Sequence, residues 1–385
     1  MSDLVSGKPP VAHNAAKGGA AKALADGEQL PYGVARNAND FRNLKSDGRN
    51  VTPTANAGQI SATLTQEINA PAMCQFVYHI DANWTQADFD QFKPGSKLEI
   101  SNQDIQAAKL APLYVSGVSL DASAGERTHS ALTVTAFDRM HFMRFGAYTA
   151  AFVQKNDASI FRWLADSADL KLDASGLSED SYPYVLQDNE TCYDFLLKRC
   201  AQGEYECMVV LARGVETLVV GKRRYDDTPA ETLVYNHDIV AVNLDMRAPT
   251  LGSTVAAWGY DVIHGKPVMG SFGSNSPEFR MKGTQTAFEA AKPFGSSPVT
   301  LRRPDLIDES SLNHLADAAR GRLQDTFLEG SATLKDINLK ATPGIIVALD
   351  GLNANFNGLY QVVRSTHRIE RGRNFTVLNL RRSGM

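Results

Sequence analysis

The sequence is poor in cysteine and has no long hydrophobic run, and each shortage excludes a class of protein. Its 385 residues include four cysteines, which are too few and too scattered for a disulfide framework. The longest apolar runs, such as residues 344–349, are far shorter than the ~20 residues that cross a bilayer. The first residues also lack the basic start and apolar stretch of a secretory leader. We therefore expect no membrane insertion and synthesis in the cytoplasm.

The chain also lacks an excess of charge of either sign. The 39 Lys and Arg residues stand against 43 Asp and Glu residues, which gives a net charge of −4. A strongly basic field, of the kind that binds nucleic acid along a whole chain, is therefore excluded. Hydrophobic residues make up 43% of the sequence, so there is ample material for a folded core.

Motifs of the common catalytic and cofactor-binding families are absent as well. None of the three Gly-Lys dipeptides has the spacing of a phosphate-binding loop, and no glycine-rich dinucleotide fingerprint follows a strand pattern. There is no nucleophile elbow, no H-E-x-x-H zinc motif and no EF-hand loop. We therefore predict no catalytic residue, no cofactor and no metal site. Paired carboxylates stay open, because 43 acidic residues always contain pairs and only geometry selects two of them.

Alternation of period two is abundant, and it is typical of half-buried antiparallel strands. Ile60, Ala62 and Leu64 alternate with polar residues, and a second such series runs from residue 74 to residue 80. Turn signals separate several such segments, which favours a small barrel or sandwich over residues 56–150.

Three further segments complete the predicted organisation. Residues 151–231 mix helix and strand patterns as an α+β insert, and residues 232–385 return to strand texture as a second unit. A prominent helix, predicted over residues 310–328, interrupts that unit because its apolar residues recur at spacings of three and four. Residues 1–55 are rich in Ala, Gly, Asn and Asp, and we expect an extended or disordered arm unless a partner binds it. The predicted fold class is mainly β with an α+β insert. The two β units share no sequence repeat that can be counted, so a duplication is a hypothesis.

Four segments, taken in order, carry a resemblance to a known family. They are residues 69–71 with 92–95 and 117–118, the run Gln187–Leu196, the run Val255–Asp261, and residues 342–344 with 357–362 and His367. The run at Gln187 is similar to the family pattern Q-x-N-x-S-D-x-x-F-L, with Thr191 and Cys192 where the family has Ser and Asp. Over residues 56–385 the chain resembles the tail and baseplate hub family of contractile phages and injection systems. That family includes phage late control protein D and the hub portion of VgrG-type spike proteins.

The resemblance implies a structural protein and not an enzyme. Each chain would supply two tube-like antiparallel β-barrel domains, and three chains would form a homotrimer around a central channel. Such a ring would be a symmetry adaptor that joins a hexameric inner tube to a trimeric spike. The implied partners are the inner tube protein, a spike protein on a separate polypeptide, the baseplate wedge proteins, and a tape-measure protein or cargo in the channel. The chain would be made in the bacterial cytoplasm and would become a component of a phage virion or phage-tail-like particle.

The resemblance names no contact residues, so the candidates come from the strand pattern. We predict an interface at aromatic residues that flank candidate sheet edges, Phe76 and Tyr78 in the first unit and Trp258 and Tyr260 in the second. The competing interpretation places all four in a core, since aromatic residues dominate cores as well as interfaces. Two other functions stay open, a β-rich hydrolase of cell-wall glycan and a glycan-binding module of a tail.

Overall fold

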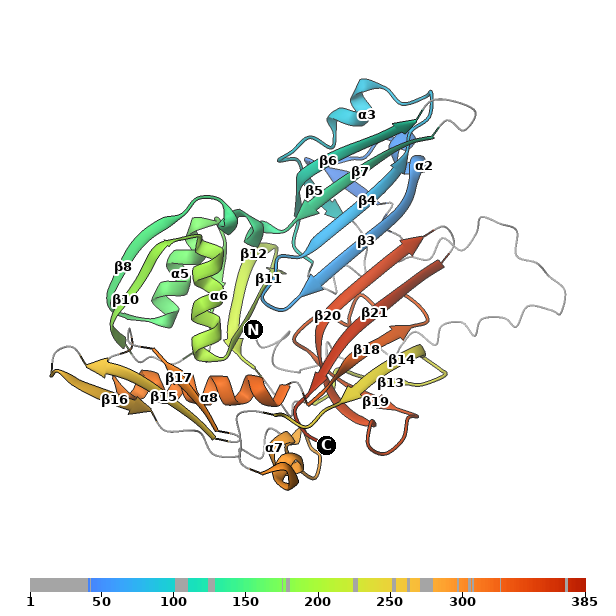
Figure 1. The fold of residues 1–385 in the computed structure, drawn as a ribbon. Coiled ribbons are helices and arrows are strands. Elements are labelled where there is room, and N and C mark those ends of the chain that lie inside the picture. Colours follow the sequence, from blue (N-terminus) through green and yellow to red (C-terminus); the bar gives the residue numbers. More distant parts are fainter. Residues whose placement is uncertain are drawn as a thin grey trace.

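The structure is a computed structural model, and its fold is mainly β with large antiparallel sheets, as predicted (Figure 1). It describes residue 41 and residues 43–100, 110–123, 129–174, 176–177, 181–223, 228–250, 254–261, 264–270, 280–295, 298–303, 306, 308–325, 327–370 and 373–385. Of the arm predicted over residues 1–55, residues 1–40 and 42 lie outside the described residues.

One sheet of thirteen strands runs through both β units. Its strands in the first unit are β1 (Leu44–Ser46), β2 (Arg49–Asn50), β3 (Gln59–Glu67), β4 (Met73–His79), β5 (Lys97–Ile100), β6 (Leu113–Ser123) and β7 (His129–Phe137). Its strands in the second unit are β13 (Glu231–Val234), β14 (Ile239–Met246), β18 (Leu328–Leu334), β19 (Ile346–Asp350), β20 (Gly358–Glu370) and β21 (Arg373–Arg382). The strand order is β14-β18-β21-β20-β3-β4-β7-β6-β5-β1-β2, with β19 and β13 branching from β20. Figure 1 shows the first unit above the second, with β3 beside β20 where the units meet.

The core of the first unit is built by the alternation seen in the sequence. Ala62 and Leu64 of β3 pair with Phe76 and Cys74 of β4, and all four side chains are buried in one cluster. The polar residues between them face the other side of the sheet. Two short helices, α2 (Pro53–Gly58) and α3 (Gln86–Asp90), lie on this unit.

Part of the segment predicted as an arm belongs to the first unit. Residues 44–58 form β1, β2 and α2. Phe41, Leu44, Val51 and Ala55 are buried in the first core. The sequence prediction missed this packing because these apolar residues are few and their spacing shows no period. Burial against a sheet formed later in the chain orders them.

The two units share one topology. Across the sheet, the successive strands of the first unit are β3, β4, β7 and β6, and those of the second unit are β14, β18, β21 and β20. When these four strands are numbered by their order along the chain, both units arrange them across the sheet as first, second, fourth and third. Every neighbouring pair is antiparallel. The backbone therefore contains the repeat that the sequence does not reveal.

The irregularities of the two units also coincide. The first strand of each unit is irregular near its start, at residues 59–61 in β3 and at residues 239–241 in β14. The third strand along the chain has a register shift at residues 115–117 in β6 and at residues 362–364 in β20. Because a bulge marks a fixed position in a strand pair, these matches align the two units residue by residue.

A tight turn directly before β5 and before β19 is repeated as well. Gly95 and Gly344 have φ angles of 91° and 88°, a conformation that glycine adopts without steric cost. The N–H of Gly95 donates to the carbonyl of Val115 at 2.8 Å, and the N–H of Gly344 donates to the carbonyl of Val362 at 2.8 Å. The two Pro-Gly dipeptides of the sequence thus occupy equivalent positions in the two units.

Direct strand pairing joins the two units. Residues 364–370 of β20 pair antiparallel with residues 61–67 of β3. Ile369 of β20 is buried in the core of the first unit. On the opposite face of the sheet, Arg364 contacts Glu67 at 2.6 Å. The two units therefore form one continuous sheet within a single chain.

The α+β insert forms a layer beside the first unit. Its elements are η1 (Arg139–Arg144), β8 (Tyr148–Asn156), α5 (Asp157–Ser167), β9 (Lys171–Asp173), β10 (Ser181–Glu190), α6 (Cys192–Gly203), β11 (Tyr205–Ala212) and β12 (Val215–Lys222). Thr191, from the run that carries the resemblance, caps α6 by accepting a hydrogen bond from the N–H of Asp194 at 3.0 Å. Asn156 caps α5 in the same way. Buried side chains of α5, α6, β11 and β12 form one core.

A second small α/β layer lies between β14 and β18 in the chain, and the sequence analysis did not separate it from the second unit. Its elements are β15 (Thr254–Asp261), β16 (Lys266–Gly270), α7 (Ala287–Ala291), η3 (Lys292–Phe294), β17 (Pro298–Arg302) and α8 (Glu309–Asp325). The helix α8 is the prominent helix predicted over residues 310–328. Val255 and Ala257 of β15 pack against Leu312 and Leu315 of α8, which gives this three-stranded sheet a core of its own.

Candidate functional site

Two long strands of the main sheet leave an edge open. β6 pairs with β5 only at residues 113 and 114, so its residues 117–122 pair with β7 alone. Residues 241–246 of β14 pair with β18 alone. Within the described ranges, no strand pairs with the outer edge of either segment. Such an edge presents a row of backbone donors and acceptors to another strand.

The side chains of these two edges are apolar on the core-facing side. Val118 and Leu120 of β6 lie opposite buried residues of β7, yet they are 40% and 61% exposed. On β14, Val242, Leu244 and Met246 pack against the second core and are only partly buried. Apolar residues in this position extend the core to the rim of the sheet, where a further strand would cover them. The alternation was visible in the sequence, but the open edge was not.

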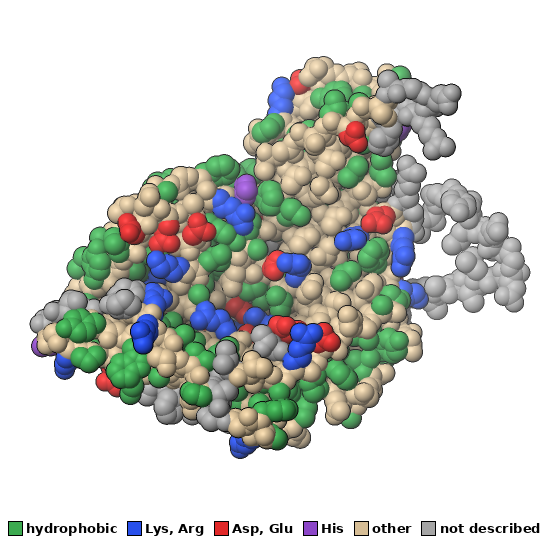
Figure 2. Space-filling view, viewed as in Figure 1, with side chains coloured by type: hydrophobic (Ala, Val, Ile, Leu, Met, Phe, Trp, Pro, Cys, Tyr) green, Lys and Arg blue, Asp and Glu red, His purple; other side chains and the backbone are tan. Residues whose placement is uncertain are grey.

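The opposite face of the main sheet is mostly polar, with charged side chains such as Glu67, Arg364 and Asp245 among uncharged ones. In the first unit Thr63, Gln75 and Thr135 lie side by side on β3, β4 and β7, while Thr65 stands opposite Met73 and Thr133 opposite Val77. Figure 2 shows few charged side chains over this part of the sheet. In the second unit the same face continues with Thr366, Asn379, Ser331 and Asn243. A polar surface therefore extends over both units.

An ion network ties the insert, α8 and the second unit together. Asp325, the last residue of α8, contacts Arg223 and lies 3.3 Å from Arg381 of β21. Arg381 also contacts Glu206 of β11, and Gln361 of β20 donates a hydrogen bond to Glu206 at 2.7 Å. The side chains of Arg223 and Asp325 are 2% and 8% exposed. Figure 2 shows charged side chains gathered where these elements meet. Because buried charges need their partners, the network fixes both α/β layers to the second unit.

Two of the four predicted interface residues are core residues in the structure. Phe76 and Tyr78 are 0% and 1% exposed in the core of the first unit. The ring of Tyr78 lies 4.9 Å from that of Phe92 and 6.1 Å from that of Trp84. Their alternation pointed to the buried side of β4, which is a central strand and not an edge. Neither residue presents surface to another chain.

The other two predicted residues are exposed. Trp258 and Tyr260 are 42% and 44% exposed, on the face of β15 that points away from α8. Met269, which pairs with Trp258, is exposed beside them. β15 is the middle strand of the small sheet and not an edge of the main sheet. A contact of Trp258 and Tyr260 with another chain stays a prediction.

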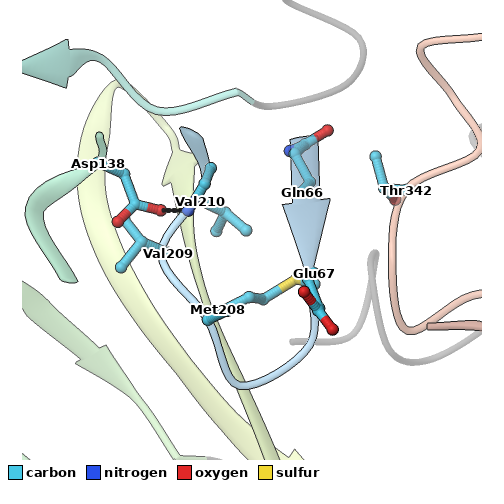
Figure 3. Close-up of a pocket in the computed structure, with 9 residues that line it drawn as sticks. Gln66, Glu67, Asp138, Met208, Val209, Val210 and Thr342 are labelled. Atoms are coloured by element: carbon cyan, nitrogen blue, oxygen red, sulfur yellow. Dashed lines mark hydrogen bonds between the residues drawn. The ribbon is translucent and has the colours of Figure 1, made fainter. Parts of the chain in front are cut away.

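A small cavity lies where the first unit, the insert and the second unit meet (Figure 3). It is lined by Gln66, Glu67, Ala70, Ala72, Asp138, Met208, Val209, Val210 and Thr342. Its volume of about 10 Å³ is close to the smallest space that holds one water molecule. Asp138 accepts hydrogen bonds from the N–H groups of Ala72 at 2.8 Å and Met140 at 2.9 Å. Burial raises the pKa of Asp138 to about 7. Through these two hydrogen bonds the buried carboxyl group caps η1 and holds the chain before β4.

The described part of the chain contains neither a candidate metal site nor a candidate membrane-spanning helix. Among those residues, no group of three or more His, Cys, Asp and Glu side chains could hold a metal ion. Nor does any described helix have the length and apolar character needed to cross a membrane.

The fold is shared with proteins of known structure. It is similar to the 43 kDa tail protein of prophage MuSo2 from Shewanella oneidensis, with 11% identity, a TM-score of 0.64, and coverage of 88% of this chain and 97% of that chain. It is also similar to a tail protein from Neisseria meningitidis, with 12% identity, a TM-score of 0.62, and coverage of 88% and 95%. A third similar structure is a component of the type VI secretion system of E. coli, with 11% identity, a TM-score of 0.54, and coverage of 89% and 77%. The resemblance to tail and injection-system proteins is thus confirmed at the level of the fold.

The sequence comparisons give a family. No curated protein matches the sequence. The family model described as the Alg8 N-terminal domain matches residues 41–371, which is most of the chain. The protein therefore belongs to the Alg8 N-terminal domain family.

Proposed function

We propose that this chain is the structural hub of a contractile tail or injection machine, and that it works as a homotrimer. The observation that carries the proposal is the internal repeat. Two units of the same topology, with matching bulges, stand side by side in one continuous sheet. The description of the Alg8 N-terminal domain family names no reaction, so it does not oppose a structural role.

The repeat gives the proposal its geometry. Three chains with two equivalent units each would place six similar units in a ring. One face of the ring could then match a hexameric tube, while the whole keeps threefold symmetry for a trimeric spike. Each junction inside a chain would be followed by a junction between chains. The open edges of β6 and β14 lie at the two ends of this arrangement.

The polar face of the main sheet fits the inside of a channel. It runs over both units and carries Thr, Ser, Asn and Gln side chains together with charged residues of both signs, such as the ion pair of Arg364 with Glu67. These side chains stay hydrated, and because charges of both signs are present, as in the pair of Arg364 with Glu67, they produce no strong field of one sign that would trap a passing polymer. We propose that this face lines a central channel, through which a tape-measure protein or cargo passes.

The proposed relatives and partners follow from the sequence resemblance to phage late control protein D and to the hub portion of VgrG-type spikes. The similar E. coli protein is itself described as resembling the T4 bacteriophage tail proteins gp27 and gp5. On this basis the proposed partners are an inner tube protein, a separate spike protein and baseplate wedge proteins, within a virion or phage-tail-like particle.

The proposed role is not enzymatic. One observation favours a glycan-binding module instead, namely the exposed Trp258 and Tyr260 on the open face of β15, since aromatic rings can stack on sugars. Binding of cell-wall glycan by a stable monomer, lost in Trp258→Ala, would support that second function. Turnover of peptidoglycan by the purified chain would support a hydrolase.

The proposal is tested by the mass and symmetry of the purified protein. Three chains of 41.9 kDa give about 126 kDa. We expect this mass by native mass spectrometry or light scattering, and a threefold ring with a central hole by electron microscopy. A protein that stays a monomer up to high micromolar concentration would overturn the hub proposal.

A further inference from the structure

We infer that β6 of one copy pairs antiparallel with β14 of a second copy, in the register that β20 and β3 have within one chain. The inference rests on the proposed trimer and adds the strands and the register that would build it. It follows from the repeat together with the chemistry of the two open edges.

The repeat assigns an equivalent strand to each side of the junction within the chain. β20 is the third strand of the second unit along the chain, and β6 is the third strand of the first. β3 is the first strand of the first unit, and β14 is the first strand of the second. The pairing of β20 with β3 therefore has one counterpart, the pairing of β6 with β14. Within one chain these two strands lie at opposite ends of the repeated sheet, so β14 must come from another copy.

The matched irregularities fix the equivalent residues. The shift at residues 115–117 of β6 corresponds to the shift at residues 362–364 of β20. The shift at residues 239–241 of β14 corresponds to that at residues 59–61 of β3. Within the chain, His367 of β20 stands opposite Leu64 of β3. Counting from the shifts, the equivalent pair is Leu120 opposite Leu244 of the second copy.

The remaining pairs of the register follow by counting outward along both strands. They are Gly117 with Arg247, Val118 with Met246, Ser119 with Asp245, Asp121 with Asn243, and Ala122 with Val242, the second residue of each pair coming from the second copy.

The register brings together side chains of similar polarity, although side-chain polarity was not used to derive it. On the core-facing side it sets Val118, Leu120 and Ala122 against three apolar residues of the second copy. The exposed Leu120 meets Leu244, and both would be covered by the pairing. On the other side it sets Ser119 against Asp245, so polar residues face the proposed channel. A slip of one residue would place Leu120 against Asn243 or Asp245 and would expose the apolar rows.

The symmetry of this contact also fits a closed ring. β6 and β14 are different surfaces, so the contact runs head to tail from one copy to the next. A head-to-tail contact leaves an unpaired edge at each end unless the rotation from copy to copy returns to the first copy and closes a ring. Closure after three copies would cover all six of the edges that three separate chains expose. It would also remove the exposed strands that otherwise promote aggregation.

The test is cysteine cross-linking of the full-length purified protein. The double variant Leu120→Cys with Leu244→Cys places two thiols opposite each other in the proposed register, where Cβ atoms of paired strands lie about 5 Å apart. A second in-register variant, Ser119→Cys with Asp245→Cys, covers the other hydrogen-bonding class of pair. After mild oxidation we expect a covalent trimer as the main band on a non-reducing gel for at least one of them. The four native cysteines are buried, so the unmodified protein is the background control.

Three controls give the result its meaning. The single variants Leu120→Cys and Leu244→Cys cannot close the ring and should yield no covalent trimer. The out-of-register variant Leu120→Cys with Asn243→Cys puts the two thiols on opposite faces and should cross-link at least tenfold less. Circular dichroism of each variant shows that the fold is kept.

The outcomes separate this inference from the proposed function. A protein of about 126 kDa whose two in-register variants both fail to cross-link would overturn the strand pairing and leave the trimer standing. Stronger cross-linking of the out-of-register variant would overturn the register. A monomer by native mass would overturn both the pairing and the hub proposal.

Discussion

Removing the charge of Asp325 should destabilise the protein by about 3 kcal/mol. Asp325 faces both Arg223 and Arg381 with its side chain only 8% exposed. The variant Asp325→Asn leaves the buried guanidinium of Arg223 and the half-buried one of Arg381 with Glu206 as their remaining carboxylate in the network. Breaking a buried ion pair by removing one partner costs about 3–5 kcal/mol. We expect the lower end of that range, because asparagine keeps one oxygen towards the arginines.

The matched control is the pair of Arg364 with Glu67, which is the same kind of contact at the surface. Its side chains are 43% and 31% exposed, and exposed pairs contribute about 0–1 kcal/mol. Glu67→Gln should therefore cost less than about 1 kcal/mol. The assay is urea unfolding of both variants and of the unmodified protein, followed by tryptophan fluorescence and by circular dichroism. Equal midpoints for Asp325→Asn and Glu67→Gln would refute the argument that the network holds the α/β layers to the second unit.

Three further predictions concern the edge, the pH dependence and the core. Leu120→Asp should abolish the trimer in native mass spectrometry while the circular dichroism spectrum stays that of the folded chain, because this side chain is 61% exposed in the single chain. Val153→Asp on β8, at a similarly exposed position, should leave the trimer intact, and loss of the trimer in both variants would contradict a specific role of the β6 edge. Burial lowers the pKa of His367 to about 4, so the unfolded chain binds more protons between pH 4 and pH 6.5 and stability is lost as the pH falls through that window. The loss is about 3 kcal/mol, and His367→Leu should flatten this part of the stability profile; an unchanged slope would contradict it. Phe76→Ala should cost about 3–5 kcal/mol as a core cavity, and Trp258→Ala should cost under 1 kcal/mol, both measured by urea unfolding; comparable losses would contradict the core and surface positions of the two rings.

The strands and the helix could be predicted from the sequence because each depends on local periodicity. The alternation around Ala62, Leu64 and Phe76 correctly indicates which residues enter the first core. The spacing of Leu312 and Leu315 correctly indicates the buried stripe of α8. These patterns report which face of an element is buried, and they do so without knowledge of the neighbours.

The interface could not be predicted in the same way, because an edge is a property of the whole sheet. Tyr78 and Leu120 occupy similar apolar rows in the sequence, yet one lies on a central strand and the other on an open edge. Aromatic content favoured Tyr78, whereas the structure leaves Leu120 uncovered. The repeat was hidden for a related reason. Two strands can have the same place in a fold when they share only the alternation and the turn, as at Gly95 and Gly344. Such strands can have few identical residues.

The most direct test of the account is a symmetry-resolved image of the purified assembly by electron microscopy, with no symmetry imposed. The account predicts three copies in a ring, with six similar β units around a central hole. It also predicts that the junctions between copies look like the β3–β20 junction within each copy. An assembly without a threefold axis, or a ring in which these two kinds of junction differ in strand direction, would contradict it.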